Sequence, residues 1–583
     1  MNQFDTPGYT PIENQETFSA TRLIVGLLLL VPGTLIYLLI QFFPALQTLA
    51  ASQTDWNMLN PPKFVGMENY TQLSTDSVFG TAVVYTLLIV FARLVIIALI
   101  PPLVGALVGA QGFAGRATNR LLLSVLAVLI VPVALPVLLR GFIAPIWGTT
   151  PSPLTNGLLG MNLASPDGAR NTILLLDSII TAAIAAVVGG AAFMAVMRGR
   201  EVSPSSSRAG IGVWLIGLLL ALGSAPQTFT LPYILTQGGP GNATQTIGLF
   251  FYKSAFIVLN AGYASAQATL MIFATLFIGL LVGIVIWGFR LRLNFTPPAP
   301  RVEAAGLLSF LSVPLVVLIG LPSLVLVGWG LWLATSQGGF SALNETVNQG
   351  QLFLNTVGGS WLAIWLVQIP LTYLLGLSLG FVRPINRTIS NIVFLGLLML
   401  AFIPSEALTL QWWQSLRDLG WLNTTQATGY TWVVGMFSLV IFKLFFDGAF
   451  DRYKVAREDG QTSTDAFLNT VLLPSLAIVL LVGTTLSFVS AQALWWPLIA
   501  TNSQSSFSFA PQIVQISNQF GTQRPTGVAL SLVFIGVFGL IFLPIFALLQ
   551  VLVLDRLALL AGPQVIWGKS KRSPTAESNL TGF

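Results

Sequence analysis

Uncharged apolar stretches of about 20 residues recur along the whole chain, and charged residues gather between them. A stretch of this length crosses the hydrocarbon core of a bilayer as a helix, so each one predicts a transmembrane segment. The pattern predicts twelve such helices, six in each half of the chain. They lie near residues 23–43, 80–110, 120–143, 172–196, 209–235, 265–289, 305–333, 353–381, 388–410, 428–448, 471–498 and 527–554.

The first predicted span, Leu23–Phe43, is expected to remain in the mature protein. It lacks the basic n-region and the small-residue cleavage site of a signal peptide. The positive-inside rule orients the helices, because cytoplasmic loops are enriched in Lys and Arg. With the N-terminus inside, 19 basic residues fall in cytoplasmic segments and 6 in outer ones, so both termini are predicted to be cytoplasmic.

The composition agrees with this pattern. Of the 583 residues, 54% are hydrophobic and only 8% are charged. An ordinary globular protein carries about 25% charged residues, so a soluble enzyme, a disordered chain and a nucleic-acid-binding domain are poor interpretations. The net charge of +6 is better assigned to loop residues that orient helices than to a nucleic-acid partner. We therefore predict an all-α polytopic membrane protein.

The chain contains neither His nor Cys, which leaves few residues for chemistry. The commonest general base and metal ligand is missing, and so are thiol nucleophiles and thiolate metal sites. No Gly-x-x-x-x-Gly-Lys-Ser/Thr phosphate loop occurs. We expect no catalytic residue, metal site or cofactor in this chain. ATP-driven transport would need its ATPase and its soluble receptor as separate polypeptides.

The proline-rich segment Asn294–Arg301 lies between two spans and predicts a short linker. It divides the chain into a first half, residues 1–297, and a second half, residues 298–583. Each half contains an even number of predicted spans, so the two halves have the same orientation. Two such halves predict a parallel repeat around a central path.

Short motifs flank these spans in a fixed order. The first half contains Phe64-Val65-Gly66 with Asn69-Tyr70, and then Thr236, Gly238-Gly239-Pro240, Asn242 and Thr244. The second half contains Gly420-Trp421-Leu422-Asn423-Thr424 and Trp496-Pro497-Leu498. In combination these motifs resemble those of the two permease subunits of binding-protein-dependent ABC importers for carbohydrates, of the maltose and glycerol-3-phosphate type. The resemblance covers nearly the whole chain.

This resemblance implies a type I ABC importer permease fold in which two normally separate subunits are fused. It implies a translocation subunit, not an enzyme, that works with a cytoplasmic ABC ATPase dimer and an extracytoplasmic substrate-binding protein. The implied substrate is a carbohydrate or a polyol phosphate. The implied location is the plasma membrane of a prokaryote.

The most charged part of the chain, residues 450–470, lies between two spans on the predicted cytoplasmic side. It predicts a helix–Gly–helix element, because Gly460 permits a bend that other residues resist. Such an element can dock into a groove of a soluble partner, and an ordinary solvated loop is the alternative. In the resembled family a coupling helix at this place fits against the ATPase. Its expected members here are Tyr453, Val455, Ala456, Glu458, Asp459, Gly460, Phe467 and Pro474.

Both loops depart from the family pattern. In the second half, Val455-Ala456-Arg457 stands where the family has Glu-Ala-Ala. The first-half loop, residues 198–208, has no Asp-Gly pair, and only Glu201 and its basic flanks resemble a coupling site. The missing Asp-Gly pair puts symmetric docking on two ATPase subunits in question, and the first half is expected either to couple poorly or to make a different contact.

Ionisable residues within spans are costly unless they are paired or hydrated, so they are candidates for a substrate path. Arg93 and Asp177 are such candidates. The alternative, which we favour, is a mutual pair that only holds the bundle together. Glu406 and Lys443 lie near predicted span ends, where the side chains are expected to snorkel to the surface.

Aromatic doublets at the predicted outer ends of two spans are weaker candidates. They are Trp412, Trp413, Trp495 and Trp496, and Gln492 lies beside the second doublet. Aromatic faces suit the apolar faces of sugars, and a Gln side chain can bind sugar hydroxyls. The alternative is an interfacial aromatic belt, which is the better interpretation for most Trp residues in membrane proteins.

Two other functions compete with an ABC permease. An ion-coupled secondary transporter with twelve helices would need carboxylates inside the membrane, and only Asp177 and Glu406 are available. A membrane enzyme acting on lipids is disfavoured because the chain lacks His, Cys and clustered carboxylates.

Overall fold

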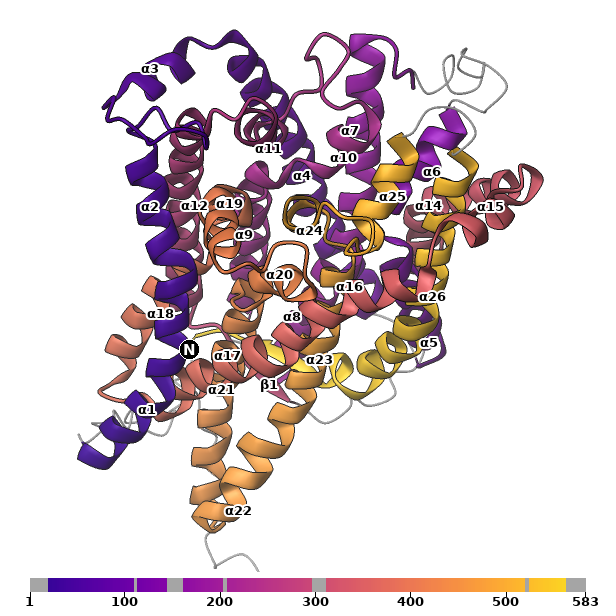
Figure 1. Ribbon diagram of the computed structural model, residues 1–583. Coiled ribbons are helices and arrows are strands. Elements are labelled where there is room, and N and C mark those ends of the chain that lie inside the picture. Colours follow the sequence, from indigo (N-terminus) through magenta and orange to yellow (C-terminus); the bar gives the residue numbers. More distant parts are fainter. Residues whose placement is uncertain are drawn as a thin grey trace, which may run out of the picture.

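The computed structural model describes residues 19–109, 113–143, 161–202, 207–295, 311–518 and 524–562, which are mostly helical (Figure 1). Short π- and 3₁₀-helical segments are labelled η. The first half contains α1 (Ala20–Tyr37), η1 (Leu38–Phe42), α2 (Phe43–Ala51), α3 (Glu68–Thr75), α4 (Ser77–Gly109), α5 (Phe113–Leu129), α6 (Ala134–Ile143), α7 (Pro166–Ile184), η3 (Ala185–Gly189), α8 (Gly190–Val202), α9 (Ser207–Gly223), η5 (Ala225–Gln227), α10 (Thr230–Leu235), α11 (Ile247–Tyr252), η6 (Lys253–Ile257), α12 (Ala261–Phe289) and strand β1 (Arg292–Phe295).

The second half follows the same order of long helices. It contains α14 (Ser312–Ser336), α15 (Gly339–Thr346), α16 (Gln349–Ala363), η7 (Ile364–Gln368), α17 (Ile369–Gly376), η8 (Leu377–Val382), α18 (Arg387–Ala401), α19 (Ser405–Asp418), α20 (Thr425–Gly429), η9 (Tyr430–Trp432), α21 (Met436–Glu458), α22 (Ser463–Phe467), η10 (Leu468–Leu472), α23 (Leu473–Ala491), α24 (Trp495–Ala500), α25 (Phe509–Asn518), α26 (Arg524–Leu552), η11 (Leu554–Arg556) and strand β2 (Leu557–Leu560).

Eight helices among the described residues are long and apolar enough to cross a membrane, and the number rises to twelve if each of four bent pairs is one span. The bends lie between α5 and α6 (77°), α9 and α10 (49°), α18 and α19 (76°), and η9 and α21 (45°). The predicted all-α polytopic fold is confirmed.

Several predicted boundaries differ from those in the structure, including the end of one span and the start of the linker. The span predicted over residues 471–498 ends at Ala491, and the short helix α24 follows it. Pro497 has no amide hydrogen to donate and clashes with a carbonyl four residues earlier, so a continuous helix through this segment is disfavoured. The predicted linker begins too early, because Asn294 and Phe295 belong to β1. The rest of the linker lies outside the described residues.

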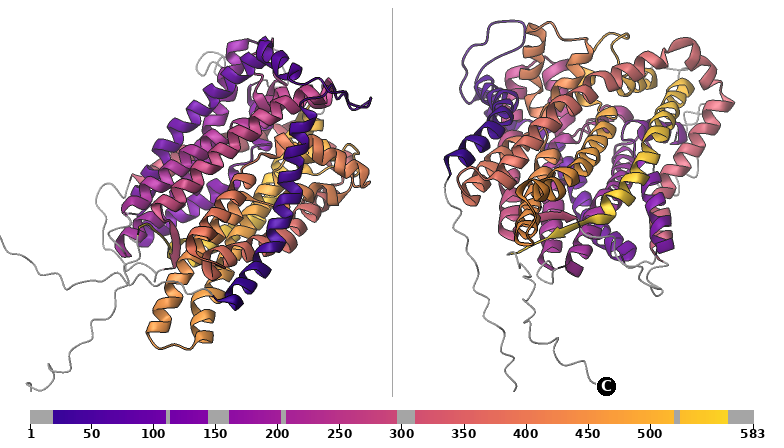
Figure 2. Two further views of the ribbon diagram at one scale, coloured as in Figure 1. Left: turned by 90° about the vertical axis from the view of Figure 1, so that its left-hand side faces the viewer. Right: turned by 90° about the horizontal axis from the view of Figure 1, so that it is seen from below.

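The first span of each half packs against the other half. Helix α1 lies along α17, η8 and α18 of the second half, and Figure 2 shows it against those helices. Helix α14 lies along α5 and α6 of the first half. The approach of α1 is close, since a Cβ added at Gly26 or Gly33 would overlap Pro384 or Leu375. The two halves are therefore interlocked.

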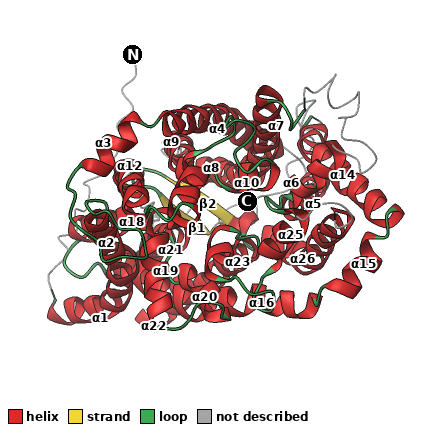
Figure 3. Cartoon of the chain, turned by 45° about the horizontal axis from the view of Figure 1, so that its top comes forward, coloured by secondary structure: helices red, strands yellow, loops and turns green. Residues whose placement is uncertain are grey.

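The two strands join the halves as well. Strands β1 and β2 form an antiparallel sheet in which Leu293 pairs with Leu559, and Figure 3 shows this sheet between helices of both halves. Strand β1 packs on α21 and strand β2 packs on α8, so each strand lies against a helix of the opposite half. We call this two-stranded sheet the clasp.

Helices α21 and α22 form a hairpin that projects beyond the rest of the described chain (Figure 1, bottom). We call residues 452–467 the hairpin. The end of the molecule that carries it is the hairpin end, and the opposite end, which carries α3, is the far end.

Candidate functional site

The hairpin turns at Gly460, which has a φ of +88°. Glycine suits this left-handed conformation because it has no Cβ, and the amide of Gln461 closes the end of α21 by donating to the carbonyl of Ala456. The hydroxyl of Thr462 then caps α22, because it accepts a hydrogen bond from the amide of Asp465 at 3.1 Å. The local structure is helix–Gly–helix, as the sequence predicts.

The tip of the hairpin is fully accessible. Residues 457–465 are all exposed, and no other described element covers them. Three predicted coupling residues, Glu458, Asp459 and Gly460, lie in this tip, and the side chain of Val455 just before it is 40% exposed. The tip therefore offers three acidic side chains, Glu458, Asp459 and Asp465, together with Arg457 and the adjacent apolar Val455, to a partner.

The other predicted coupling residues lie elsewhere. The rings of Tyr453 and Phe467 pack on Phe381, with centroid separations of 5.3 and 5.7 Å, so they stabilise the base of the hairpin. Ala456 is buried. Pro474 lies in the first turn of α23, beyond the hairpin. In the first half, Glu201 belongs to α8, and its side chain lies outside the described residues.

The first half has a shorter counterpart of the hairpin. Gly199 of α8 and Gly448 of α21 occupy equivalent places, because an added Cβ would overlap the carbonyl oxygens of Leu559 and Leu293, which pair with each other in the clasp. Helix α8 continues three residues beyond Gly199, whereas α21 continues ten residues beyond Gly448. Seven additional residues lengthen a helix by about 10 Å. Along the chain, seven residues separate Gly199 from the first residue of α9, and fourteen separate Gly448 from the first residue of α22, so the first-half connection is the shorter one.

A buried ion-pair cluster holds the base of the hairpin. Lys443 pairs with Asp447 one turn later on α21, and Arg383 lies 3.1 Å from the same carboxylate. The ammonium group of Lys443 also donates to the side chain of Asn391 at 3.2 Å. The Lys443 side chain is only 2% exposed, so the predicted snorkelling is wrong. A buried carboxylate compensates its charge instead.

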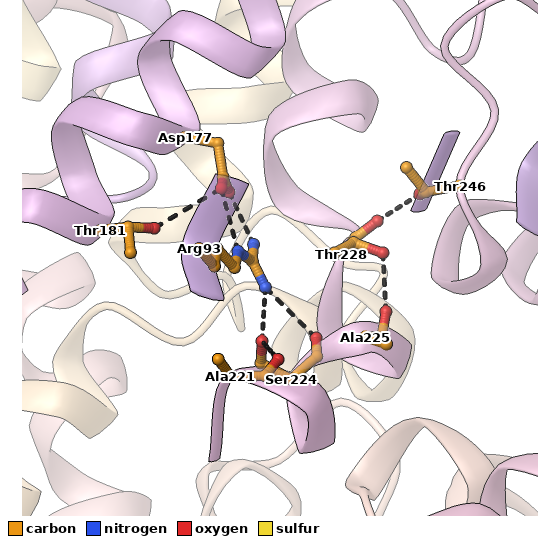
Figure 4. Close-up of polar contacts among 8 residues, drawn as sticks. All are labelled: Arg93, Asp177, Thr181, Ala221, Ser224, Ala225, Thr228 and Thr246. Carbon is orange, nitrogen blue, oxygen red and sulfur yellow. Dashed lines mark hydrogen bonds and ion pairs between the residues drawn. The ribbon is translucent and has the colours of Figure 1, made fainter. Parts of the chain in front are cut away.

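The pair of Arg93 and Asp177 is a bidentate ion pair (Figure 4). Two guanidinium nitrogens of Arg93 donate to the two carboxylate oxygens, at 2.9 and 2.6 Å, and the third donates to the hydroxyl of Ser224 at 2.7 Å. These residues come from α4, α7 and the end of α9. Because the donors and acceptors satisfy one another, the pair ties α4 and α7 to the residue that follows α9, and a role of Arg93 and Asp177 in a substrate path stays a prediction.

Glu406 is buried in the first turn of α19, directly after the bend in its span. The predicted snorkelling is wrong for this residue too. Its carboxylate accepts a hydrogen bond from the hydroxyl of Ser405 at 3.2 Å. Its place at a helix N-terminus favours a negative charge, which partly offsets its burial.

The tryptophans of the two doublets are mostly core residues. Trp412, Trp495 and Trp496 are buried, and their indole N–H groups donate to the carbonyl of Ile40, the hydroxyl of Thr409 and the carbonyl of Ala427, respectively. Trp495 also packs edge-on against Phe229 of the first half, at 4.6 Å between centroids. These three residues form neither a lipid-facing belt nor an open sugar platform. Trp413 and Gln492 are half-buried and stay candidates for the path.

The Gly-Gly-Pro motif of the first half folds a loop at the far end. The hydroxyls of Thr236 and Thr244 share a hydrogen bond of 2.6 Å, and Thr244 also donates to the carbonyl of Gly239 at 2.8 Å. Beside this loop, the ammonium group of Lys253 donates to the side chain of Gln245 at 3.1 Å, and burial lowers the pKa of Lys253. The motif therefore stabilises its own loop.

Two other motifs act in the same way. Asn69 donates to the carbonyls of Ser52 and Thr54, which fixes the loop after α2. Asn423 accepts from the amides of Asn502 and Ser503, which fixes the loop after α24. Three of the motifs that carry the family resemblance thus stabilise the loops in or beside which they lie.

Sequence reasoning missed the clasp and the cluster around Lys443. The clasp strands have four residues each, which is too short for a strand pattern to be read. The spacing of Lys443 and Asp447 could have predicted their ion pair, because residues four positions apart lie on the same face of a helix.

Comparison with known proteins finds no matching family model, but it finds related membrane proteins. The chain is 27% identical over 281 residues to the probable ABC transporter permease protein YurN of Bacillus subtilis, which covers 44% of this chain and 94% of YurN. It is 28% identical over 273 residues to the sulfoquinovosyl glycerol transport system permease protein SmoG of Agrobacterium fabrum, covering 42% of this chain and 85% of SmoG.

A third relative is the probable starch degradation products transport system permease protein AmyD of Thermoanaerobacterium thermosulfurigenes, 23% identical over 42% of this chain and 87% of AmyD. The expected resemblance to carbohydrate ABC permeases is confirmed by these matches. Each relative corresponds to less than half of this chain, so the chain is long enough for two such subunits. The secondary-transporter alternative receives no support.

Proposed function

We propose that this chain is the membrane-spanning component of an ATP-driven ABC importer for carbohydrates, with two permease subunits fused into one polypeptide. The observation that carries the proposal is the similarity to three ABC permeases, each matched over most of its own length but over less than half of this chain. Two of these relatives are named for carbohydrate-type cargo, which supports the substrate class. The repeated order of long helices supports a division at residues 297 and 298.

The hairpin is the proposed docking site for a cytoplasmic ABC ATPase. Its tip projects from the bundle, is exposed over residues 457–465 and carries Glu458 and Asp459. The aromatic contacts of Tyr453 and Phe467 fix its base to η8, so force applied at the tip reaches the spans of the second half. The hairpin end is then cytoplasmic, and a substrate-binding protein delivers its cargo at the far end.

ATP binding switches the two halves between inward and outward access in this proposal. A switch of this kind requires a contact whose strength differs between the two states. Docking of the hairpin in an ATPase whose shape changes with ATP supplies this differential contact. The chain itself contributes no catalytic group, and ATP hydrolysis takes place in the partner.

Purification from the native host tests the proposal. We expect an ABC ATPase to copurify with the chain, and we expect carbohydrate uptake into proteoliposomes to require ATP and a soluble binding protein. Absence of any ATPase, together with uptake driven by a proton or sodium gradient, would overturn the proposal.

A further inference from the structure

The clasp is tied to the base of the hairpin through β1. Arg452 donates to the side chain of Asn294 at 2.9 Å, and Arg292 forms an ion pair with Asp451 at 3.2 Å. The missing Cβ at Gly448 lets the backbone of β1 lie directly on α21. Strand β1 is therefore held in place by residues of the second half, although in sequence it is the last described element of the first half.

Strand β2 and the turn before it are tied to the first half. The guanidinium of Arg198, on α8, donates to the carbonyl of Leu557 at 2.7 Å. Asp555 forms ion pairs with both Arg198 and Arg120, and Arg120 belongs to α5. The missing Cβ at Gly199 lets β2 lie directly on α8.

A continuous path of contacts therefore runs from the hairpin through β1, β2 and α8 to α5. The backbone ladder of the clasp is its middle link. This path matters because α8 lacks the two additional helical turns that make α21 a projecting arm. The first half has no comparable arm of its own among the described residues.

We propose that the clasp makes α8 follow the hairpin, so that one docked hairpin moves both halves. Gly199 and Gly448 are positioning residues in this scheme, since each seats one strand on one helix. The inference rests on the proposed docking of an ATPase at the hairpin.

Glycine-to-alanine substitutions test the clasp selectively. Gly448→Ala pushes β1 off α21 and Gly199→Ala pushes β2 off α8, because each added methyl group overlaps a strand carbonyl. Gly288→Ala is the matched control, since Gly288 is helical, adjacent to the clasp in sequence and open around its Cα. Alanine is intrinsically a better helix former than glycine, so a loss at Gly199 or Gly448 reports the strand contact.

Two readouts separate a positioning role from simple destabilisation. The first is the number of substrate molecules imported per ATP hydrolysed by the copurified transporter, which we expect to fall about tenfold in both clasp variants and to stay unchanged in G288A. The second uses the absence of Cys from the chain. Spin labels at Asn469→Cys, beside the base of the hairpin, and Arg200→Cys, both exposed positions outside the docking tip, report the distance between the hairpin and α8.

With the clasp intact, we expect this distance to stay constant between the ATP-free and ATP-bound states. In the clasp variants we expect it to change by about 5 Å, because the hairpin then moves alone. An unchanged transport ratio and an unchanged distance in G199A and G448A would overturn the inference. Where one variant does not fold, Asn294→Ala, which removes only the contact to Arg452, decides the question. Failure of the proposed function has a different signature, since no ATPase would then bind the unmodified chain.

Discussion

The two halves differ most where α8 meets α9 and where α21 meets α22. In the second half, α21 extends ten residues beyond its glycine contact with the clasp, and the hairpin projects from the bundle. In the first half, α8 ends three residues beyond the equivalent glycine. Two copies of one helical plan thus differ by about two helical turns at one loop. The comparison indicates that the proposed docking of an ATPase has been concentrated in one half.

The buried ion pairs also differ between the two halves in where they lie relative to these connections. In the first half, Arg93 and Asp177 join α4 to α7, and Arg93 contacts Ser224 after the C-terminal end of α9, whereas α8 is connected to the N-terminal end of α9 (Figure 4). In the second half, Arg383, Lys443 and Asp447 join η8 to α21, close to the base of the hairpin. Both clusters tie equivalent spans together, but only the second one stiffens a projecting arm.

Removing the hairpin should have the largest effect. The variant replaces residues 455–466 with the first-half sequence Ser203-Pro204-Ser205-Ser206, so that both connections become short. We expect ATPase copurification and transport to fall by more than about 100-fold, because the central contacts of an interface carry most of its binding energy. Quantitative immunodetection of the ATPase measures the loss. Undiminished copurification would show that the hairpin is not the main docking site.

Removing one carboxylate from each buried ion pair should affect transport differently in the two halves. Asp177→Asn and Asp447→Asn each leave a buried cation without its carboxylate, which typically costs about 3–5 kcal/mol. We expect both variants to melt at a lower temperature in detergent. We expect only D447N to lower the substrate imported per ATP hydrolysed, because only that pair supports the hairpin. An equal loss of substrate imported per ATP hydrolysed in D177N would show that the two ion pairs do not differ in their effect on coupling.

Substitution of Gly460 should have a moderate effect. Gly460→Val forces a β-branched residue into a left-handed conformation, a strain of about 1–3 kcal/mol that reshapes the tip. We expect a folded protein in which transport falls several-fold relative to ATP hydrolysis. Gly338→Val is the control, because Gly338 also has a positive φ, of 67°, but lies outside the hairpin. Wild-type coupling in G460V would contradict the assignment of the tip.

Changes to the first-half connection should have the smallest effect. Replacing residues 203–207 with alanine leaves Gly199 and its contact with β2 intact. We expect less than a twofold change in transport, measured as initial uptake into proteoliposomes, because this connection is too short to reach far into a partner. A loss as large as that caused by changing the hairpin tip would show that both connections dock.

The sequence predicts the spans well because apolar length is a local property. All twelve predicted spans correspond to helices or bent helix pairs, and Gly460 marks the turn of the hairpin. The clasp could not be predicted, since its strands are short and their pairing joins residues far apart in the chain. The interlocking of α1 with α17 depends likewise on distant contacts.

The candidate site was predicted less completely than the fold. Glu458, Asp459 and Gly460 lie at an exposed tip, but Tyr453, Phe467 and Ala456 pack inward. Aromatic residues beside charges look alike in sequence whether they face a partner or a neighbouring helix. The choice between these roles depends on Phe381, which lies 72 residues before Tyr453 and 86 before Phe467 and contacts both rings.

The central claim is that the second-half hairpin contacts the ATPase and that the first-half connection does not. A photoreactive amino acid placed at Asp459 in one variant and at Ser205 in another tests this claim directly in the copurified transporter. We predict a strong crosslink to the ATPase from position 459 and none above background from position 205. Equal crosslinking from both positions, or crosslinking from position 205 alone, would contradict the account.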